Sequence, residues 1–143
     1  MSDDITTARL QDTAPERFVR LRRTLGVTSF GINQMILEPG QRMRIHLHEQ
    51  QEEVYLVLSG RLTLVVEGDD HDFGPHELVR VPPHVRRQLV NRGPERVSLL
   101  ALGGYGEHEP RDARAFRAWD DEPQAVQDVP LPDDLPEDER RSA

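Results

Sequence analysis

The feature that most limits the fold of this chain is a series of short apolar segments within residues 17–102. About eight such segments follow one another at roughly ten-residue intervals. Turn-forming clusters separate them, including Glu-Pro-Gly at 38–40 and a proline pair at 82–83. The region has no convincing helical period. The pattern therefore predicts an all-β fold, an antiparallel sandwich or barrel.

Alternation within single segments predicts which side chains share a face. Residues 28–37 alternate, so Gln34 and Met35 lie on opposite faces of one strand, and at most one of them reaches an interior pocket. The sequence does not show which of the two does. Residues 54–58 are continuously apolar, which indicates a central strand. Residues 17–26 alternate only in part, so an edge strand and a short amphipathic helix both fit them.

The chain of 143 residues suits one domain with two polar ends. Residues 1–16 have no sustained period, and we expect a loose N-terminal arm there. We assign residues 17–109 to the barrel. Residues 110–143 hold five of the 11 prolines and carry −5 of the net charge of −8, which predicts a short acidic, Pro-rich C-terminal tail.

Two aromatic residues suggest how that tail meets the rest of the protein. Phe116 and Trp119 are three positions apart, so one helical turn would place both on the same side. We expect them to dock the tail partly on the barrel or on a second subunit. From Asp120 onward we expect the chain to be progressively less ordered.

Composition argues against several classes of function. A net charge of −8 without a basic stripe argues against binding to nucleic acid or to an anionic membrane. No apolar run approaches the roughly 18 residues that span a bilayer, and the N-terminus is too acidic for a signal peptide, so we expect a cytoplasmic protein. The chain has no cysteine and no lysine, which removes thiolate ligands and Schiff-base chemistry.

One short stretch carries the side chains best suited to a metal site. His46 and His48 are two positions apart, so on a strand both imidazoles project from one face. Glu53 lies on the strand that follows. Two imidazoles and one carboxylate are the ligand set expected for Fe(II), Zn or Mn, with the remaining positions left to water or substrate. The alternative is a polar, solvent-facing strand end.

The same stretch resembles the first motif of the cupin superfamily, G-x5-H-x-H-x3,4-E-x6-G. Gly40, His46, His48, Glu53 and Gly60 occupy every marked position. The resemblance implies a double-stranded β-helix, or jelly-roll barrel, with a pocket at its mouth. It also implies a small-molecule ligand, a divalent transition metal (Fe, Mn, Zn or Ni) and a homodimer.

The second motif of the family is only partly present. Residues 74–91 resemble G-x5-P-x-G-x2-H-x3-N, with two extra residues before Pro82. Counted from Pro82, the turn glycine of the family falls on His84, which is tolerable because histidine is enriched at positive φ. The fourth metal ligand of the family, a histidine, falls on Arg87. At about 5 Å and an effective dielectric near 20, a guanidinium would repel a divalent ion by about 6 to 7 kcal/mol.

Three arrangements of the site follow from this substitution. Arg87 can extend away and leave His46, His48 and Glu53 as a three-ligand metal site. His84 can reach over as a substitute ligand. Arg87 can instead replace the metal and pair with Glu53 or Glu52, so that the histidines become ordinary pocket residues.

Two classes of function fit these residues. The first is a metal-dependent enzyme of the oxygenase or isomerase type, acting on a small carboxylate or carbonyl compound, with Arg87, Tyr55 and Gln34 as candidate substrate-binding residues. The second is a non-catalytic module that binds a small molecule or a metal. The fold alone does not decide between them.

Overall fold

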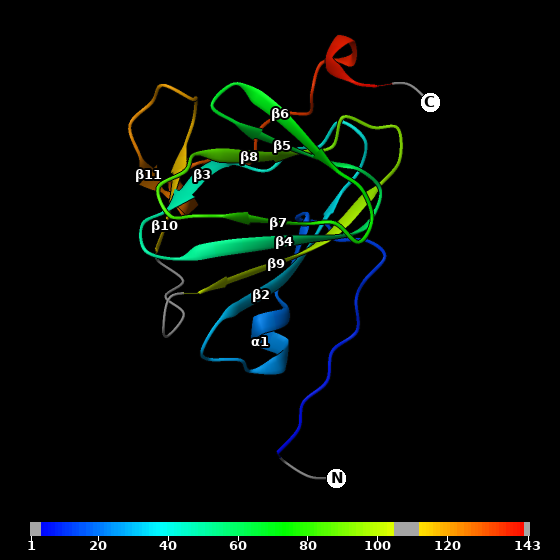
Figure 1. Cartoon of the computed structure of the whole chain (residues 1–143), viewed down its shortest axis with the longest axis vertical. Helices are drawn as coiled ribbons and strands as arrows, with labels where there is room; N and C mark the ends of the chain where they lie inside the picture. Colours follow the sequence, from blue (N-terminus) through cyan, green and yellow to red (C-terminus); the bar gives the residue numbers. More distant parts are fainter. Residues whose placement is uncertain (1–3, 105–111, 142–143) are drawn as a thin grey trace.

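The computed structural model describes residues 4–104 and 112–141 and shows two antiparallel sheets packed face to face (Figure 1). The five-stranded sheet has the order β1 (Phe18–Val19), β2 (Gly31–Leu37), β9 (Val97–Gly104), β4 (Glu52–Ser59) and β7 (Leu78–Val81). The six-stranded sheet has the order β11 (Gln124–Ala125), β10 (Ala113–Phe116), β3 (Ile45–His48), β8 (Arg87–Val90), β5 (Leu62–Val66) and β6 (Asp69–Phe73). The predicted all-β jelly-roll barrel is confirmed.

Alternate side chains of the two sheets meet in one apolar core. In the five-stranded sheet, Leu99 pairs with Met35 on one side and with Val57 on the other, and all three are buried. Leu64 and Leu89 reach the same core from the six-stranded sheet. A fully buried side chain of this kind contributes about 1.5–3 kcal/mol. The core therefore fixes the register of both sheets and, with it, which residues face the interior.

The structure shows which face of β2 lies toward the interior of the barrel. Met35 points into the core, and Gln34 points away from it. The Gln34 carboxamide exchanges two hydrogen bonds of 2.9 Å with the backbone of Gln11 and donates to Ser98 Oγ at 3.0 Å. Gln34 is buried by the N-terminal segment rather than by the barrel.

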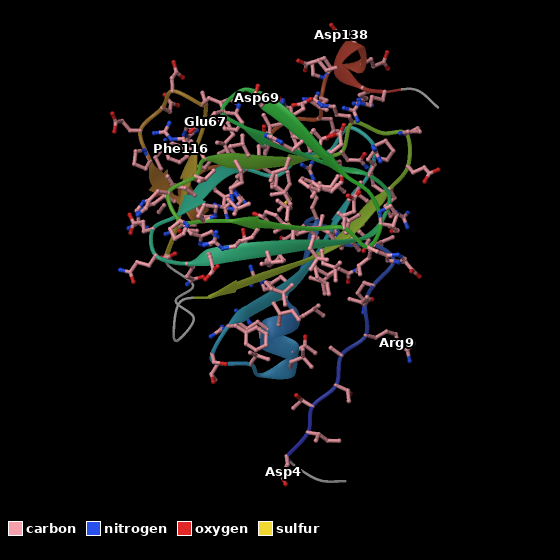
Figure 2. The ribbon with its side chains drawn as sticks, viewed as in Figure 1. Asp4, Arg9, Glu67, Asp69, Phe116 and Asp138 are labelled. Carbon is pink, nitrogen blue, oxygen red and sulfur yellow. The ribbon has the colours of Figure 1, made fainter. Side chains whose placement is uncertain are left out.

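The segment from Arg17 combines the two predicted alternatives. Phe18–Val19 forms the two-residue edge strand β1, and α1 follows over Leu21–Leu25. Gly26 ends this helix in the left-handed conformation, with φ of 76°. Along the N-terminal arm, Asp4 and Arg9 point away from the barrel (Figure 2). In the described part of the chain no helix has the length and apolar character needed to cross a membrane.

The C-terminal segment is more closely integrated than the sequence indicated. Instead of a helical turn, residues 113–116 form β10, which pairs with β3 and places Ala115 opposite His46. Phe116 is buried and Trp119 half-buried. Beyond Asp120, Val129 and Leu135 are buried, so parts of the tail pack against the rest of the protein, while the lower order of this segment stays a prediction. The pairing of β10 with a distant strand overrides the local aromatic spacing.

The two motif glycines occupy backbone conformations that suit glycine. Gly60 follows β4 with φ of 77°, and a Cβ there would lie 2.2 Å from the carbonyl oxygen of Arg96. Gly40 has φ of 87°, and a Cβ would meet the Arg140 guanidinium at 2.6 Å. At Gly60 a side chain would collide with backbone, whereas at Gly40 it would meet only the end of a flexible side chain, so the positive φ is what favours glycine there. Each lies at an end of the stretch that carries the histidines.

Candidate metal centre

The candidate site lies between the two sheets, with contributions from both. β3 presents His46 and His48, β8 presents Arg87, and β4 of the opposite sheet presents Glu53. Arg87 is the direct register partner of His46, so the two side chains emerge next to each other. The alternation of β3 and the closure of the barrel bring these groups together.

The three predicted ligands converge. Ligand atoms of His46, His48 and Glu53 all lie within 4.8 Å of one another. Nε2 of His46 is 3.6 Å from Oε1 of Glu53, and Nε2 of His48 is 3.6 Å from Oε2. The two rings are edge-on, with centroids 5.5 Å apart. Each imidazole thus directs the same nitrogen toward one carboxylate.

The surroundings of each Nδ1 favour one tautomer. Nδ1 of His46 is 3.2 Å from the carbonyl oxygen of Arg44, which can only accept a hydrogen bond. Nδ1 of His48 is 3.4 Å from Oδ2 of Asp112, another acceptor. If a ring carries a single proton, these acceptors favour its placement on Nδ1, which would leave the Nε2 lone pair directed toward Glu53.

Arg87 occupies the centre of a second set of contacts on the same carboxylate. Its Nη2 donates to Glu53 Oε1 at 2.6 Å, its Nε donates to Tyr55 Oη at 3.1 Å, and its Nη1 donates to the carbonyl of Val85 at 3.1 Å. The Tyr55 hydroxyl donates to the same Oε1 of Glu53. Arg87 and Tyr55 are both completely buried. Arg87 is thus held by contacts within the protein.

These contacts set the charges of the site. Burial would raise the pKa of Glu53, but hydrogen bonds from whichever of His46 and His48 carries a proton on Nε2, and the charge of Arg87, hold it well below its ordinary value. Burial and then Arg87 lower the pKa of His46. Burial and the charge of Glu53 raise the pKa of Tyr55 well above its ordinary value. At neutral pH the site therefore holds a carboxylate, a neutral His46 imidazole and a protonated phenol.

This donor set fits a divalent transition metal. Neutral imidazole nitrogens and a carboxylate oxygen are ordinary ligands of such ions. Oε1 of Glu53 is taken by Arg87 and Tyr55, whereas Oε2 faces His48. The residues that would hold the ion are His46 and His48 through Nε2 and Glu53 through Oε2.

The remaining predicted site residues lie elsewhere or already have partners. His84 is exposed and is not among the three converging ligands, although its φ of 70° matches a turn glycine position. Gln34 faces away from the core. Three N–H donors of Arg87 and the hydroxyl of Tyr55 are used within the protein, and both side chains are completely buried, so a ligand would have to displace neighbouring groups to reach them.

Asp112 is a site residue that the sequence did not reveal. Its buried carboxylate accepts hydrogen bonds from the backbone N–H groups of Gln50 and Gln51, each at 2.9 Å, and lies beside His48. No local motif marks it, because 64 positions separate it from His48 and only the pairing of β10 with β3 brings the two together. The sequence predicts only that Asp112 belongs to the acidic tail.

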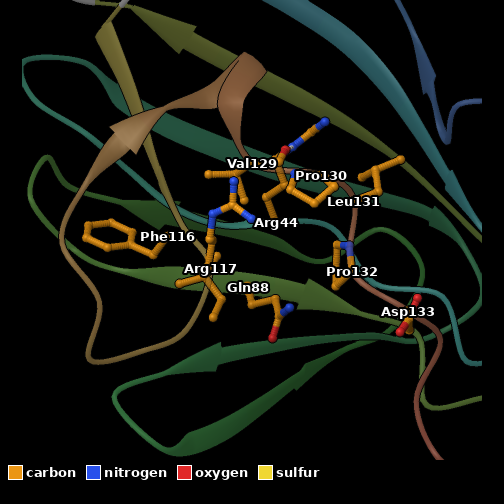
Figure 3. A pocket seen from close by; sticks show the side chains of 10 residues that line it. Arg44, Gln88, Phe116, Arg117, Val129, Pro130, Leu131, Pro132 and Asp133 are labelled. Atoms are coloured by element: carbon orange, nitrogen blue, oxygen red, sulfur yellow. Dashed lines mark hydrogen bonds between the residues drawn. The ribbon is translucent and has the colours of Figure 1, made fainter.

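Two pockets lie outside this site. One, of about 290 Å³, lies between the outer face of the six-stranded sheet and the C-terminal segment (Figure 3), where Arg44, Gln88 and Phe116 face residues 129–133. The other, of about 470 Å³, is lined by Glu67, Gly68, His84, Arg86 and Trp119. Neither lining includes His46, His48 or Glu53. The case for the metal centre therefore rests on its donor atoms rather than on cavity size.

Metal-free protein is expected to lose stability as the pH falls, in two steps. The pKa of His46 is lowered from 6.5 in the folded state, so the unfolded chain binds that proton more tightly and stability falls below about pH 6.5. The lowered pKa of Glu53 acts in the same direction as the pH falls below 4.5. Urea unfolding of chelator-treated protein measures both steps. His46→Asn should lack the first step, and an equal first step in this variant would contradict the assignment.

The comparisons with known proteins agree with the fold and the motif. The sequence profile of the family described as Cupin domain matches residues 33–103. A curated protein of Streptomyces cyaneus named polyketide synthase CurC is 29% identical over 77 residues, which cover 54% of this chain and 50% of that protein. The match thus spans about half the length of the curated relative.

Solved structures extend the similarity to nearly the whole chain. A cupin 2 conserved barrel domain protein from Salinispora arenicola has 28% identity and a TM-score of 0.50, over 53% of this chain and 63% of that one. A sugar phosphate isomerase of the cupin superfamily from Silicibacter pomeroyi has 24% identity and a TM-score of 0.59, over 91% and 94%. At this identity the second structure supports the fold alone.

Proposed function

The chain belongs to the cupin superfamily, and on that basis we propose that it binds one divalent transition metal through His46, His48 and Glu53. The metal and its neighbourhood then bind a small organic molecule. Three protein ligands leave coordination positions open for water or for an oxygen atom of that molecule.

The observation that carries the proposal is the convergence of three acceptors. Nε2 of His46 and Nε2 of His48 each lie 3.6 Å from an oxygen of Glu53, and a neutral ring protonated on Nδ1 would direct its Nε2 lone pair there. Lone pairs and a carboxylate repel one another unless a cation or a proton lies between them. A divalent ion supplies that charge and satisfies all three groups.

Arg87 is compatible with this arrangement because Glu53 has two oxygens. The guanidinium binds Oε1 at 2.6 Å, which is also the oxygen nearest Nε2 of His46, whereas Oε2 faces Nε2 of His48. Metal and guanidinium would share one carboxylate, which partly offsets their mutual repulsion. Arg87 does not extend away, as the first predicted arrangement required, but forms the ion pair with Glu53 of the third; the proposal keeps from the first only its three metal ligands.

The ligand class that we propose is a small carboxylate or carbonyl compound. An open metal position favours an oxygen ligand and would polarise a carbonyl group, which suits oxygenase or isomerase chemistry. The name of the curated relative associates that protein with polyketide synthesis, and polyketides are carbonyl compounds. A screen of such compounds by a thermal shift that requires the metal tests this part of the proposal, and shifts that are equal without metal would contradict it.

A second candidate function is a binding module that holds no metal. The ion pair between Arg87 and Glu53, at 2.6 Å and with both side chains buried or nearly so, favours it. In this case the guanidinium supplies the positive charge of the site. The two candidates differ in one measurable property, the binding of a transition metal by the purified protein.

Metal titration of the wild type and of a His46→Ala variant distinguishes the two candidate functions. Calorimetric titration of chelator-treated protein with Zn(II), Ni(II), Mn(II) and Fe(II) should detect one equivalent for at least one ion. His46→Ala should weaken that binding more than about 100-fold, because even residues that only orient a ligand are worth 10–100-fold. His71→Ala, at an exposed histidine of β6, is the matched control and should bind as the wild type does. No binding of any of the four ions by wild-type protein would exclude the metal proposal.

A further inference from the structure

Asp112 lies immediately before β10 and reaches the candidate metal centre from the C-terminal segment. Its side chain is buried, with 6% exposure. β10 pairs with β3 so that Ala113 is opposite His48, and the N–H of Glu49 donates to the carbonyl of Asp112 at 3.1 Å. The ladder between the two strands therefore places this carboxylate beside the second histidine of the motif.

The Asp112 carboxylate is held in place by the turn that follows β3. Oδ1 accepts the N–H of Gln50 at 2.9 Å, and Oδ2 accepts the N–H of Gln51 at 2.9 Å. Oδ2 also lies 3.4 Å from Nδ1 of His48. Among the described residues, no atom forms a hydrogen bond of normal geometry with this buried Nδ1. A movement of a few tenths of an ångström would complete one with Asp112.

We propose that Asp112 is the positioning residue for His48: it accepts the Nδ1–H of the imidazole and so directs the Nε2 lone pair into the metal centre. The inference rests on the proposed metal-binding function. A carboxylate can only accept hydrogen bonds, so it favours the tautomer with the proton on Nδ1 and disfavours a lone pair there. The partner that orients the ring of a metal-ligating histidine is typically such a carboxylate or a backbone carbonyl.

The two histidines are therefore oriented by different means. The ring of His46 is oriented by the carbonyl of Arg44, which belongs to the same segment of the chain. The ring of His48 is oriented by the side chain of Asp112, which lies 64 positions later in the sequence. Metal binding then depends on the correct docking of β10, although β10 supplies no ligand.

The test compares Asp112→Asn with Asp72→Asn, which removes the same charge at a carboxylate remote from the site that accepts hydrogen bonds from Thr63 and pairs with Arg141. An asparagine at 112 keeps an oxygen for the backbone N–H groups, so the variant should fold, and its thermal unfolding checks this. The first readout is the tautomer of His48 in metal-free protein, measured by nitrogen-15 NMR. We expect protonation on Nδ1 in the wild type and in Asp72→Asn, and a smaller Nδ1–H population in Asp112→Asn.

The second readout is metal affinity. Asp112→Asn should weaken Zn(II) binding about 10- to 100-fold, and Asp72→Asn should leave it unchanged. In a His46→Ala background the NMR effect on His48 should persist, because the pair does not involve His46. Protonation of His48 on Nε2 in the wild type, or an unchanged tautomer in Asp112→Asn, would overturn the inference. Wild-type protein that shows the expected tautomer but binds no metal would instead refute the proposed function and leave the pairing of Asp112 with His48 intact.

Discussion

Replacing Arg87 by histidine is expected to tighten binding of a divalent transition metal by at least about 100-fold. The variant removes a buried guanidinium that lies 2.6 Å from Glu53 and adds a third imidazole, as a potential fourth ligand, beside His46. An uncompensated guanidinium about 5 Å from a divalent ion would cost about 6 to 7 kcal/mol, and the shared carboxylate offsets only part of that cost. Titration of chelator-treated protein with Zn(II) in competition with a chromophoric chelator measures the change.

Arg87→Met is the matched variant for this experiment. Methionine removes the charge and keeps an unbranched side chain but adds no ligand of comparable strength. Its affinity should lie between those of the wild type and Arg87→His, and the two differences separate charge repulsion from ligation. Equal affinities in all three proteins would show that Arg87 does not affect the metal centre.

Replacing Glu53 by glutamine is expected to lower the free energy of unfolding of metal-free protein by about 3–5 kcal/mol. The substitution keeps the shape of the side chain but leaves the completely buried Arg87 without its counter-charge. Breaking a buried ion pair from one side has a cost of this size because the remaining charge cannot be hydrated. Chemical unfolding in urea, followed by tryptophan fluorescence and circular dichroism, gives the value.

Glu52, the neighbour of Glu53 in the sequence, provides a control with the same substitution. Glu52 pairs with Arg80 at 2.6 Å, but both side chains are more than half exposed, at 54% and 58%. Glu52→Gln should therefore change the free energy of unfolding by less than about 1 kcal/mol. A similar loss of unfolding free energy in both variants would show that the buried Arg87–Glu53 pair stabilises the protein no more than an exposed pair does. The double variant Glu53→Gln with Arg87→Met should recover part of the loss, because it also removes the buried charge.

The strands and the group of His46, His48 and Glu53 were predictable because both depend on local patterns. Alternation along β3 places His46 and His48 on one face whatever the rest of the chain does. The glycines at 40 and 60 mark the turns that bound this stretch, and the observed φ values explain why glycine stands there. The same local logic correctly placed Gln34 and Met35 on opposite faces of β2.

Other features depended on contacts that are distant in the sequence. Both faces of β2 are largely apolar, so only packing against the other sheet and the N-terminal segment decides which one is interior. Phe116 and Trp119 suggested a helical turn, but pairing with β3 makes β10 a strand. Asp112 could not be associated with His48 without that pairing. For Arg87 the sequence left three arrangements, and the buried contacts with Glu53 and Tyr55 show which groups hold the guanidinium.

The central claim is that one divalent ion binds between the two histidines and Glu53 while Arg87 remains on the same carboxylate. Anomalous diffraction at the zinc edge, from crystals grown with Zn(II), tests it directly. We expect one peak about 2.0–2.2 Å from Nε2 of His46, Nε2 of His48 and Oε2 of Glu53. No peak at these atoms, with the pair between Arg87 and Glu53 unchanged at 2.6 Å, would contradict it and favour the metal-free binding module.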